Sequence, residues 1–142
     1  MRLGGILKIK LIEDTLAQQL LASASAATSL SHVPYSNFPV GAAVLGKSGR
    51  IYQGINIENA SYPAGICAER VALGCACSSG EDGIVAIAIF SPKGDISPCG
   101  ICRQFILEFG ESIVVVFHWN GKVVQCRARE LLPYAFTKEH VK

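Results

Sequence analysis

The spacing of apolar residues changes from stretch to stretch along the chain, and each change marks an element of secondary structure. Leucines and alanines that recur every three or four residues give one apolar face and are typical of helices. Such spacing predicts helices over residues 12–28, 67–77, 99–109 and 128–132. Short apolar runs bounded by turn residues are typical of strands. They predict strands over residues 40–45, 50–56, 84–91, 113–119 and 122–126.

The connections between these elements predict the layout of the sheet. A short turn over residues 46–49 joins the first two strands, and Asn120-Gly121 joins the last two. Each pair should therefore form an antiparallel hairpin. Strands and helices alternate in the rest of the chain, which predicts an α/β fold with three α/β/α layers around a mixed five-stranded sheet. Residues 1–142 should form one domain, with residues 1–10 as a loose N-terminal arm.

The overall composition narrows the class of protein. Half of the residues are apolar, which favours an oligomer with apolar interfaces. The formal net charge is only +2, and no dense basic stripe suggests nucleic-acid binding, so a small substrate is favoured. No apolar run approaches the roughly 20 residues of a membrane-spanning helix. Charges near the N-terminus argue against a signal peptide, so we expect a cytoplasmic protein with reduced cysteines.

Three cysteines and one glutamate stand at the starts of two predicted helices. Cys99 and Cys102 are three residues apart, so both side chains can face one point. Cys67 can supply a third thiolate if the two helix starts converge, and zinc takes thiolates readily. The positive ends of two helix dipoles and the cation of Arg70 would offset the charge of three thiolates. The pattern therefore predicts a zinc site.

The number of ligands indicates what kind of zinc site this is. A structural site is closed by four protein groups, whereas a catalytic site keeps one position for water. No further cysteine or histidine has suitable spacing, so an open site is favoured, with Glu69 beside it to move protons. Two alternatives stay open: a redox pair formed by Cys99 and Cys102, and Glu69 as a surface residue that suits the helix dipole.

Polar and aromatic residues near the second strand are candidates for ligand contacts. Asn56 and Glu58 follow the end of that strand, where side chains meet ligands in open α/β sheets. An ordinary polar turn is the alternative. Tyr35 and Phe38 are aromatic residues in a polar loop over residues 29–39, and they could instead cover the edge of the core.

Taken together, these stretches resemble the small, homotetrameric, zinc-dependent cytidine deaminases. The resemblance extends over roughly residues 15–136, which is most of the chain. It rests on residues 34–43 (PYSNFPVGAA), 56–60 (NIENA), Tyr62, 67–70 (CAER), 98–104 (PCGICRQ) and 131–133 (LLP).

The resemblance implies hydrolysis of cytidine and deoxycytidine to uridine and deoxyuridine with release of ammonia, as in pyrimidine salvage. One Zn²⁺ per subunit would be held by Cys67, Cys99 and Cys102. Glu69 would move protons while hydroxide attacks C4 of the ring, and Arg70 would hydrogen-bond the thiolates.

The resemblance also implies how the substrate is held. Asn56 and Glu58 would bind the ribose hydroxyls, Phe38 would stack on the base, and the backbone of Ala68 would contact the amide edge of the pyrimidine. Tyr62 and Phe136 would reach into a neighbouring subunit's site in a homotetramer. No nucleic acid or membrane would be a partner.

Some positions depart from the family, and other functions remain open. His32 stands where the family often has a tyrosine, and Cys75, Cys77 and Cys126 have no role that the pattern indicates. A deaminase of another aminopyrimidine nucleoside, such as a nucleoside antibiotic, is the nearest alternative. A polynucleotide cytosine deaminase is another, although the Asn120-Gly121 hairpin argues against it, and a non-enzymatic zinc-binding module is a third.

Overall fold

The structure, a computed structural model, describes residues 11–141. The predicted loose arm, residues 1–10, lies outside the described residues. The strands are β1 (Gly41–Gly46), β2 (Ile51–Ile55), β3 (Ile84–Phe90), β4 (Val114–Trp119) and β5 (Lys122–Arg127). The helices are α1 (Asp14–Ala27), α2 (Ala68–Ser78) and α3 (Gly100–Phe109), with short 3₁₀ turns η1 (Thr28–Leu30), η2 (Tyr62–Ala64), η3 (Ala128–Leu131) and η4 (Lys138–His140).

The sheet is mixed and five-stranded, as predicted. Its order is β2-β1-β3-β4-β5, with β3 and β4 parallel and every other pair antiparallel. The turn between β4 and β5 has positive φ angles at both central residues, 51° at Asn120 and 71° at Gly121. Asparagine and glycine tolerate this left-handed conformation, and it gives a turn whose twist matches the two strands. The last two strands therefore form the expected antiparallel hairpin.

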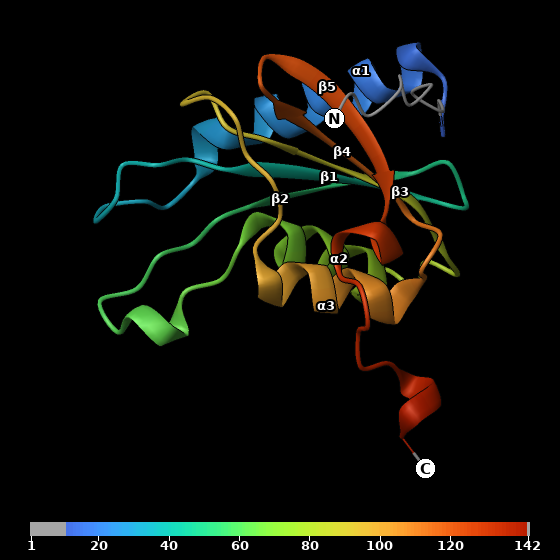
Figure 1. The fold of residues 1–142 in the computed structure, drawn as a ribbon. Helices are drawn as coiled ribbons and strands as arrows, with labels where there is room; N and C mark the ends of the chain where they lie inside the picture. The colour runs from blue at the N-terminus through green and yellow to red at the C-terminus, as the bar shows by residue number, and fades with distance from the viewer. Residues whose placement is uncertain (1–10, 142) are drawn as a thin grey trace, which may run out of the picture.

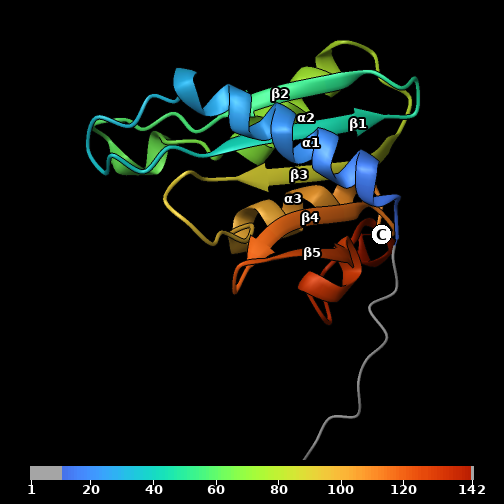
Figure 2. The same ribbon diagram turned by 90° about the horizontal axis from the view of Figure 1, so that it is seen from above.

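Helices cover both faces of the sheet, which confirms the three-layer α/β/α fold. Helix α1 crosses one face, and α2 and α3 lie side by side on the other (Figure 1 and Figure 2). Each face has its own apolar cluster: Leu20 of α1 packs on the first, and Leu73 of α2 and Ile106 of α3 pack on the second. Successive side chains of a strand point to opposite faces. Ala42 and Val44 of β1 therefore join one cluster, and Ala43 joins the other.

Two glycines let the helices approach the sheet closely. A Cβ atom on Gly41 would lie 1.9 Å from the carbonyl oxygen of Ala24 in α1. A Cβ atom on Gly54 in β2 would lie 2.3 Å from the carbonyl oxygen of Ala68 in α2. Any side chain at these positions would push backbone away. Gly54 thus sets the distance between the sheet and the first turn of α2.

The last predicted helix, over residues 128–132, is a 3₁₀ turn, η3, that ends at Leu131. The Glu130 carboxylate accepts a hydrogen bond from the backbone N–H of Arg127, which caps the start of this turn. Pro133 disfavours helical backbone at Leu132, the residue before it, so the turn does not extend into a longer helix. Among the described residues, every helix is too short or too polar to cross a membrane.

Candidate active site and metal centre

The starts of α2 and α3 meet on one face of the sheet and bring three thiols together. Cys67 is the N-cap residue of α2, Cys99 is the N-cap residue of α3, and Cys102 lies in the first turn of α3. The three sulfur atoms all lie within 4.8 Å of one another, and the Sγ atoms of Cys67 and Cys99 are 3.7 Å apart. The predicted convergence of the two helix starts is therefore present.

The thiol cluster has the dimensions of a zinc site. Zinc–sulfur bonds of about 2.3 Å in a tetrahedron place sulfur atoms about 3.8 Å apart, close to the 3.7 Å between Cys67 and Cys99. Within the part of the chain that the structure describes, no fourth Cys, His, Asp or Glu joins this group of potential ligands. The cluster can hold one metal ion with a fourth position left for another ligand.

The electrostatics of the cluster favour a thiolate at Cys67. A hydrogen bond from Cys102, helped by the guanidinium of Arg70, lowers the pKa of Cys67 to about 5 from its ordinary value of 9.0. The same hydrogen bond and burial hold the pKa of Cys102 well above its usual range, because Cys102 keeps the proton that it donates. Burial lowers the pKa of Arg70, but hydrogen bonds to Cys67 and Cys102 outweigh it and raise the pKa overall.

Arg70 also carries an unused donor. Its Nε atom is buried and has no hydrogen-bond partner among residues 11–141. A buried donor without a partner costs free energy, so the cluster gains from additional negative charge on its sulfur atoms. Three thiolates around a metal ion would supply such charge, so the buried Nε atom of Arg70 also fits a thiolate-bound metal.

Glu69 is a buried carboxyl group beside the thiols. Only 3% of its surface is exposed, and it directly follows Ala68 in the first turn of α2. Burial penalises the charged form and raises the pKa of Glu69 to about 7 from 4.5. A carboxyl group with a pKa near neutrality can take up and release protons at physiological pH. A surface residue that merely suits the helix dipole would not be buried in this way.

A cavity of about 500 Å³ opens beside Cys67. Two tyrosines, Tyr35 and Tyr62, meet edge to face in its lining, with ring centroids 5.9 Å apart. The other lining residues are Ser36, which follows Tyr35, and residues from the exit of β2 and the loop before α2. The full lining is Tyr35, Ser36, Asn56, Ile57, Glu58, Asn59, Tyr62, Gly65, Ile66 and Cys67. The cavity thus has Cys67 of the thiol cluster in the same lining as the predicted Asn56 and Glu58.

Asn56 supports the loop over residues 34–40. Its Oδ1 accepts a hydrogen bond from the backbone N–H of Val40 at 2.9 Å, and its Nδ2 donates to the backbone carbonyl of Phe38, also at 2.9 Å. Phe38, an aromatic residue of this loop, is fixed by its backbone while its side chain stays partly exposed. Phe38 does not cover the core, so the alternative interpretation of this residue is not favoured.

Glu58 supports the same loop from the other end. Its Oε1 accepts hydrogen bonds from the backbone N–H groups of Tyr35 and Ser36, at 3.0 and 3.1 Å. The Ser36 hydroxyl is the largest cause that lowers the pKa of Glu58, followed by these backbone donors. The backbone of His32 makes two hydrogen bonds to the residues on either side of Ile57. Its carbonyl accepts from the N–H of Glu58 at 2.8 Å, and its N–H donates to the carbonyl of Asn56 at 3.0 Å. The polar residues at the exit of β2 therefore hold the loop over residues 32–40 by hydrogen bonds, which a simple turn would not do.

The remaining predicted residues are more dispersed. Ala68 is fully buried at the first position of α2, between Cys67 and Glu69. Tyr62 lines the cavity of its own chain but is 76% exposed. Phe136 is 64% exposed on the C-terminal segment and does not line this cavity.

Some residues of this region were missed by reasoning from the sequence. Ser36 lines the cavity, and its Oγ accepts a hydrogen bond from the backbone N–H of Phe38 at 3.1 Å. The sequence does contain a signal for this bond, because serine side chains in loops often hydrogen-bond the backbone two residues further along the chain. Arg103, directly after Cys102, belongs to the motif over residues 98–104, but the motif by itself predicts no role for its side chain. Cys75 and Cys77 are exposed, Cys126 is half-buried, and all three are free thiols outside the cluster.

Comparison with known proteins identifies the class to which this fold and site belong. Residues 14–118 match the model of the cytidine and deoxycytidylate deaminase zinc-binding region. A cytidine deaminase of Sporosarcina psychrophila is 43% identical over 125 residues, which cover 86% of this chain and 92% of the relative. A blasticidin-S deaminase of Bacillus cereus is a more distant relative, 34% identical over 70% of this chain and 77% of its own.

Solved structures agree with the sequence comparison. The crystal structure of the cytidine deaminase from Burkholderia pseudomallei matches with a TM-score of 0.78 and 42% identity, over 84% of this chain and 98% of that one. The fold and thiol cluster thus define a zinc-binding deaminase. The chain belongs to the cytidine and deoxycytidylate deaminase family.

Proposed function

We propose that this protein hydrolyses cytidine and deoxycytidine to uridine and deoxyuridine, releasing ammonia, and so acts in pyrimidine salvage. The observation that carries the proposal is the cavity whose lining contains Cys67 of the thiol cluster together with Asn56 and Glu58. A cavity that has a potential metal ligand and hydrogen-bonding side chains in its lining suits a flat base attached to a sugar. The cytidine deaminases among its relatives support the same substrate.

Cys67, Cys99 and Cys102 would hold one Zn²⁺ per subunit. When bound there, zinc would supply a Lewis acid that makes water nucleophilic near neutral pH. Arg70 would share its charge with the thiolates of Cys67 and Cys102, as its hydrogen bonds to them suggest. This would offset the negative charge that three thiolates bring to the site.

Glu69 would carry the protons of the reaction. As water adds to C4 of the cytosine ring, the carboxylate would accept one of its protons and deliver it to N3. Glu69 would then move the second proton of the added oxygen to the amino group, which leaves as ammonia. A carboxyl group with a pKa of about 7 suits both directions of transfer.

The substrate would lie along the cavity with its sugar toward β2. Asn56 and Glu58 would bind the ribose hydroxyls, Phe38 would stack on the base, and the backbone of Ala68 would contact the amide edge of the ring. The second oxygen of Glu58 supports this role, since its Oε1 is already engaged by the loop. A carboxylate at this position suits an unmodified sugar and argues against a bulky nucleoside antibiotic.

We further propose a homotetramer whose active sites are shared between subunits, with Tyr62 and Phe136 reaching a neighbour's site. The high exposure of both aromatic side chains in the single chain supports this. Neither nucleic acid nor a membrane would be a partner. Because all six cysteines are free thiols, a reducing cytoplasm suits the protein. One sheet with an apolar cluster on each face supports a single catalytic domain.

Zinc analysis together with loss of cytidine absorbance tests this function. Glu69→Gln should keep one zinc ion per chain and lose almost all turnover, at least the 10²- to 10⁴-fold that acid–base catalysis contributes. Glu108→Gln, the same change at an exposed position of α3, is the control and should behave as wild type. Retained turnover in Glu69→Gln would contradict the role of Glu69.

A panel of substrates separates the alternatives. Cytidine and deoxycytidine should be turned over, whereas blasticidin S and a single-stranded oligonucleotide containing cytosine should not. Turnover of only the antibiotic or only the oligonucleotide would replace the proposed function. Bound zinc with no turnover of any of the four would indicate a non-enzymatic zinc module.

A further inference from the structure

The guanidinium of Arg103 connects two segments that are distant in the sequence. Its Nε donates to the backbone carbonyl of Pro98 at 2.7 Å, and one terminal nitrogen donates to the backbone carbonyl of Leu131 at 2.9 Å. The other terminal nitrogen is 3.4 Å from the hydroxyl of Ser97. All three groups of the side chain are therefore engaged, and two of the acceptors belong to the loop before α3.

This loop carries one thiol of the metal cluster. Pro98 is fully buried and directly precedes Cys99, while Arg103 directly follows Cys102. The backbone N–H of Arg103 also donates to the carbonyl of Cys99 at 2.9 Å. Arg103 thus holds the stretch from Pro98 to Cys102 by two hydrogen bonds. Its side chain bonds the carbonyl of Pro98, and its backbone N–H bonds the carbonyl of Cys99. A shift of Arg103 would move two of the three sulfur atoms.

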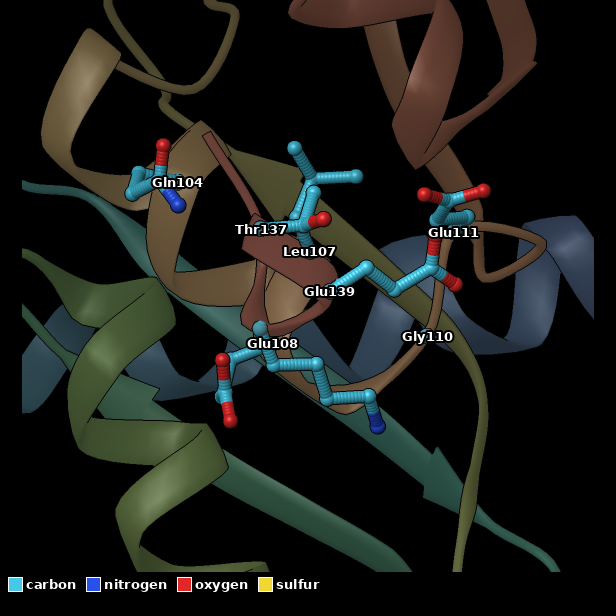
Figure 3. Close-up of a pocket in the computed structure, with 8 residues that line it drawn as sticks. Gln104, Leu107, Glu108, Gly110, Glu111, Thr137 and Glu139 are labelled. Atoms are coloured by element: carbon cyan, nitrogen blue, oxygen red, sulfur yellow. The ribbon is translucent and has the colours of Figure 1, made fainter. Parts of the chain in front are cut away.

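The third acceptor lies where the C-terminal segment begins. Leu131 ends the turn η3, and the chain then runs along α3 and away from the sheet (Figure 1). Gln104, the neighbour of Arg103, donates from its Nε2 to the backbone carbonyl of Phe136 at 2.8 Å. Gln104 and Thr137 face a cavity of about 240 Å³ between α3 and this segment (Figure 3). Two adjacent residues of α3 therefore hold the C-terminal segment at two points.

The position of Arg103 is electrostatically unfavourable for the helix alone. A cation close to a helix N-terminus is repelled by the helix dipole. The hydrogen bonds of the guanidinium offset this repulsion. Its planar fork can donate to several acceptors at once, whereas a lysine ammonium is a single point charge. The hydrogen bonds to Pro98 and Leu131 need this fork.

We propose that Arg103 is a positioning residue for the metal centre, which fixes the loop carrying Cys99 and ties it to the start of the C-terminal segment. The proposal rests on the proposed function in that the thiol cluster binds zinc. It predicts that metal affinity depends on a residue that contacts no metal ligand with its side chain. Groups that hydrogen-bond metal ligands directly typically change metal affinity by about 10- to 100-fold, and the side chain of Arg103 acts one residue further out, through Pro98.

Metal binding to the metal-free full-length chain tests the proposal. Co²⁺ is titrated first, because thiolate-to-cobalt absorption reports the geometry of the sulfur ligands, and Zn²⁺ affinity is then measured by competition with a chromophoric chelator. Arg103→Ala should bind zinc up to about tenfold more weakly than wild type, at the lower end of the effect of direct ligand partners, and show an altered cobalt spectrum. Arg103→Lys should recover part of the affinity, since an ammonium can serve one of the two carbonyl groups.

Two controls separate positioning from general loss of stability. Arg129→Ala removes an exposed arginine of η3 and should bind both metals as wild type does. Gln104→Ala removes the bond to Phe136 but leaves the contact with Pro98, so its cobalt spectrum should also be unchanged. An Arg103→Ala chain with wild-type zinc affinity and cobalt spectrum would overturn the proposal.

A variant that does not fold leaves the proposal testable. If Arg103→Ala is insoluble, Arg103→Lys carries the test, and wild-type zinc affinity in that variant would show that the fork is not needed. The proposed function is judged separately by the wild type. A wild-type chain that binds neither cobalt nor zinc would refute the zinc-dependent function itself, whatever the variants do.

Discussion

A methyl group at Gly54 should damage both the stability and the metal site of this protein. In Gly54→Ala the new Cβ atom would lie 2.3 Å from the carbonyl oxygen of Ala68 and 2.4 Å from the backbone nitrogen of Ala72. Ordinary contacts begin at 3.4 Å, so α2 must move away from β2 by about 1 Å, a change of the kind that overpacked cores undergo. Both clashing atoms are backbone, so no side-chain rotation can relieve them.

The cost follows from this displacement. Overpacking costs about 1–3 kcal/mol, and a clash with helix backbone belongs at the upper end. A loss of about 3 kcal/mol lowers Tm by roughly 6–12 °C for a chain of this size. The movement also displaces Cys67 and Glu69 from Cys99 and Cys102, because the two pairs stand on different helices. A misplacement of about 1 Å can reduce kcat/KM by about 100-fold.

The assay combines thermal unfolding, zinc content and cytidine turnover at one fixed protein concentration. Gly74→Ala is the matched control, because Gly74 lies within α2 and a Cβ atom there meets nothing within 4 Å. Alanine is the better helix former, so this variant should be more stable by about 0.5–1 kcal/mol and equally active. A Gly54→Ala chain with wild-type Tm, zinc content and turnover would refute the argument from close packing.

Three further predictions concern the loop, the first hairpin and the metal. Ser36→Ala removes the acceptor for the N–H of Phe38, so the KM for cytidine should rise several-fold with little change in kcat, and unchanged KM would contradict this. Hydrogen bonds, chiefly from Ser48, lower the pKa of Glu81 from 4.5. The stability that this carboxylate adds is complete above pH 4.5 and is lost as pH falls through its lower folded pKa. Urea unfolding should therefore show Glu81→Gln to be less stable than wild type at pH 7, with a difference that shrinks below pH 4.5, whereas a constant difference would refute it. Chelation of zinc should lower Tm in wild type, and calorimetry with and without chelator checks this.

Much of the fold could be predicted because the local signals agreed with the packing. Asn120-Gly121 forms its turn for reasons contained in two residues, and the helix predicted over 67–77 is found as α2 with Cys67 as its N-cap. The order of strands could not be read in this way. The placement of β1 between β2 and β3 depends on which edge of the hairpin meets the later strand, and no local pattern encodes that choice.

In the candidate site, too, features that depend on local residue patterns could be predicted, whereas features that depend on distant contacts could not. The three cysteines were found because zinc chemistry requires particular residue types at short spacing. The frame that Glu58 builds with Tyr35 and Ser36 was not, since it joins residues more than 20 positions apart. Arg103 was missed for the same reason, because its acceptor on Leu131 lies 28 residues away. Hydrogen bonds of this kind follow from the completed fold rather than from spacing.

The contact between Cys67 and Cys99 closes a loop in the chain. These residues are 32 positions apart, and the loop between them contains β3, which lies in the middle of the sheet with a strand on each side. Closing such a loop removes conformational freedom from the unfolded chain. A metal held by both ends would therefore act as a removable cross-link around the central strand. Its loss should speed hydrogen exchange in β3, in the interior of the sheet as well as at the site itself.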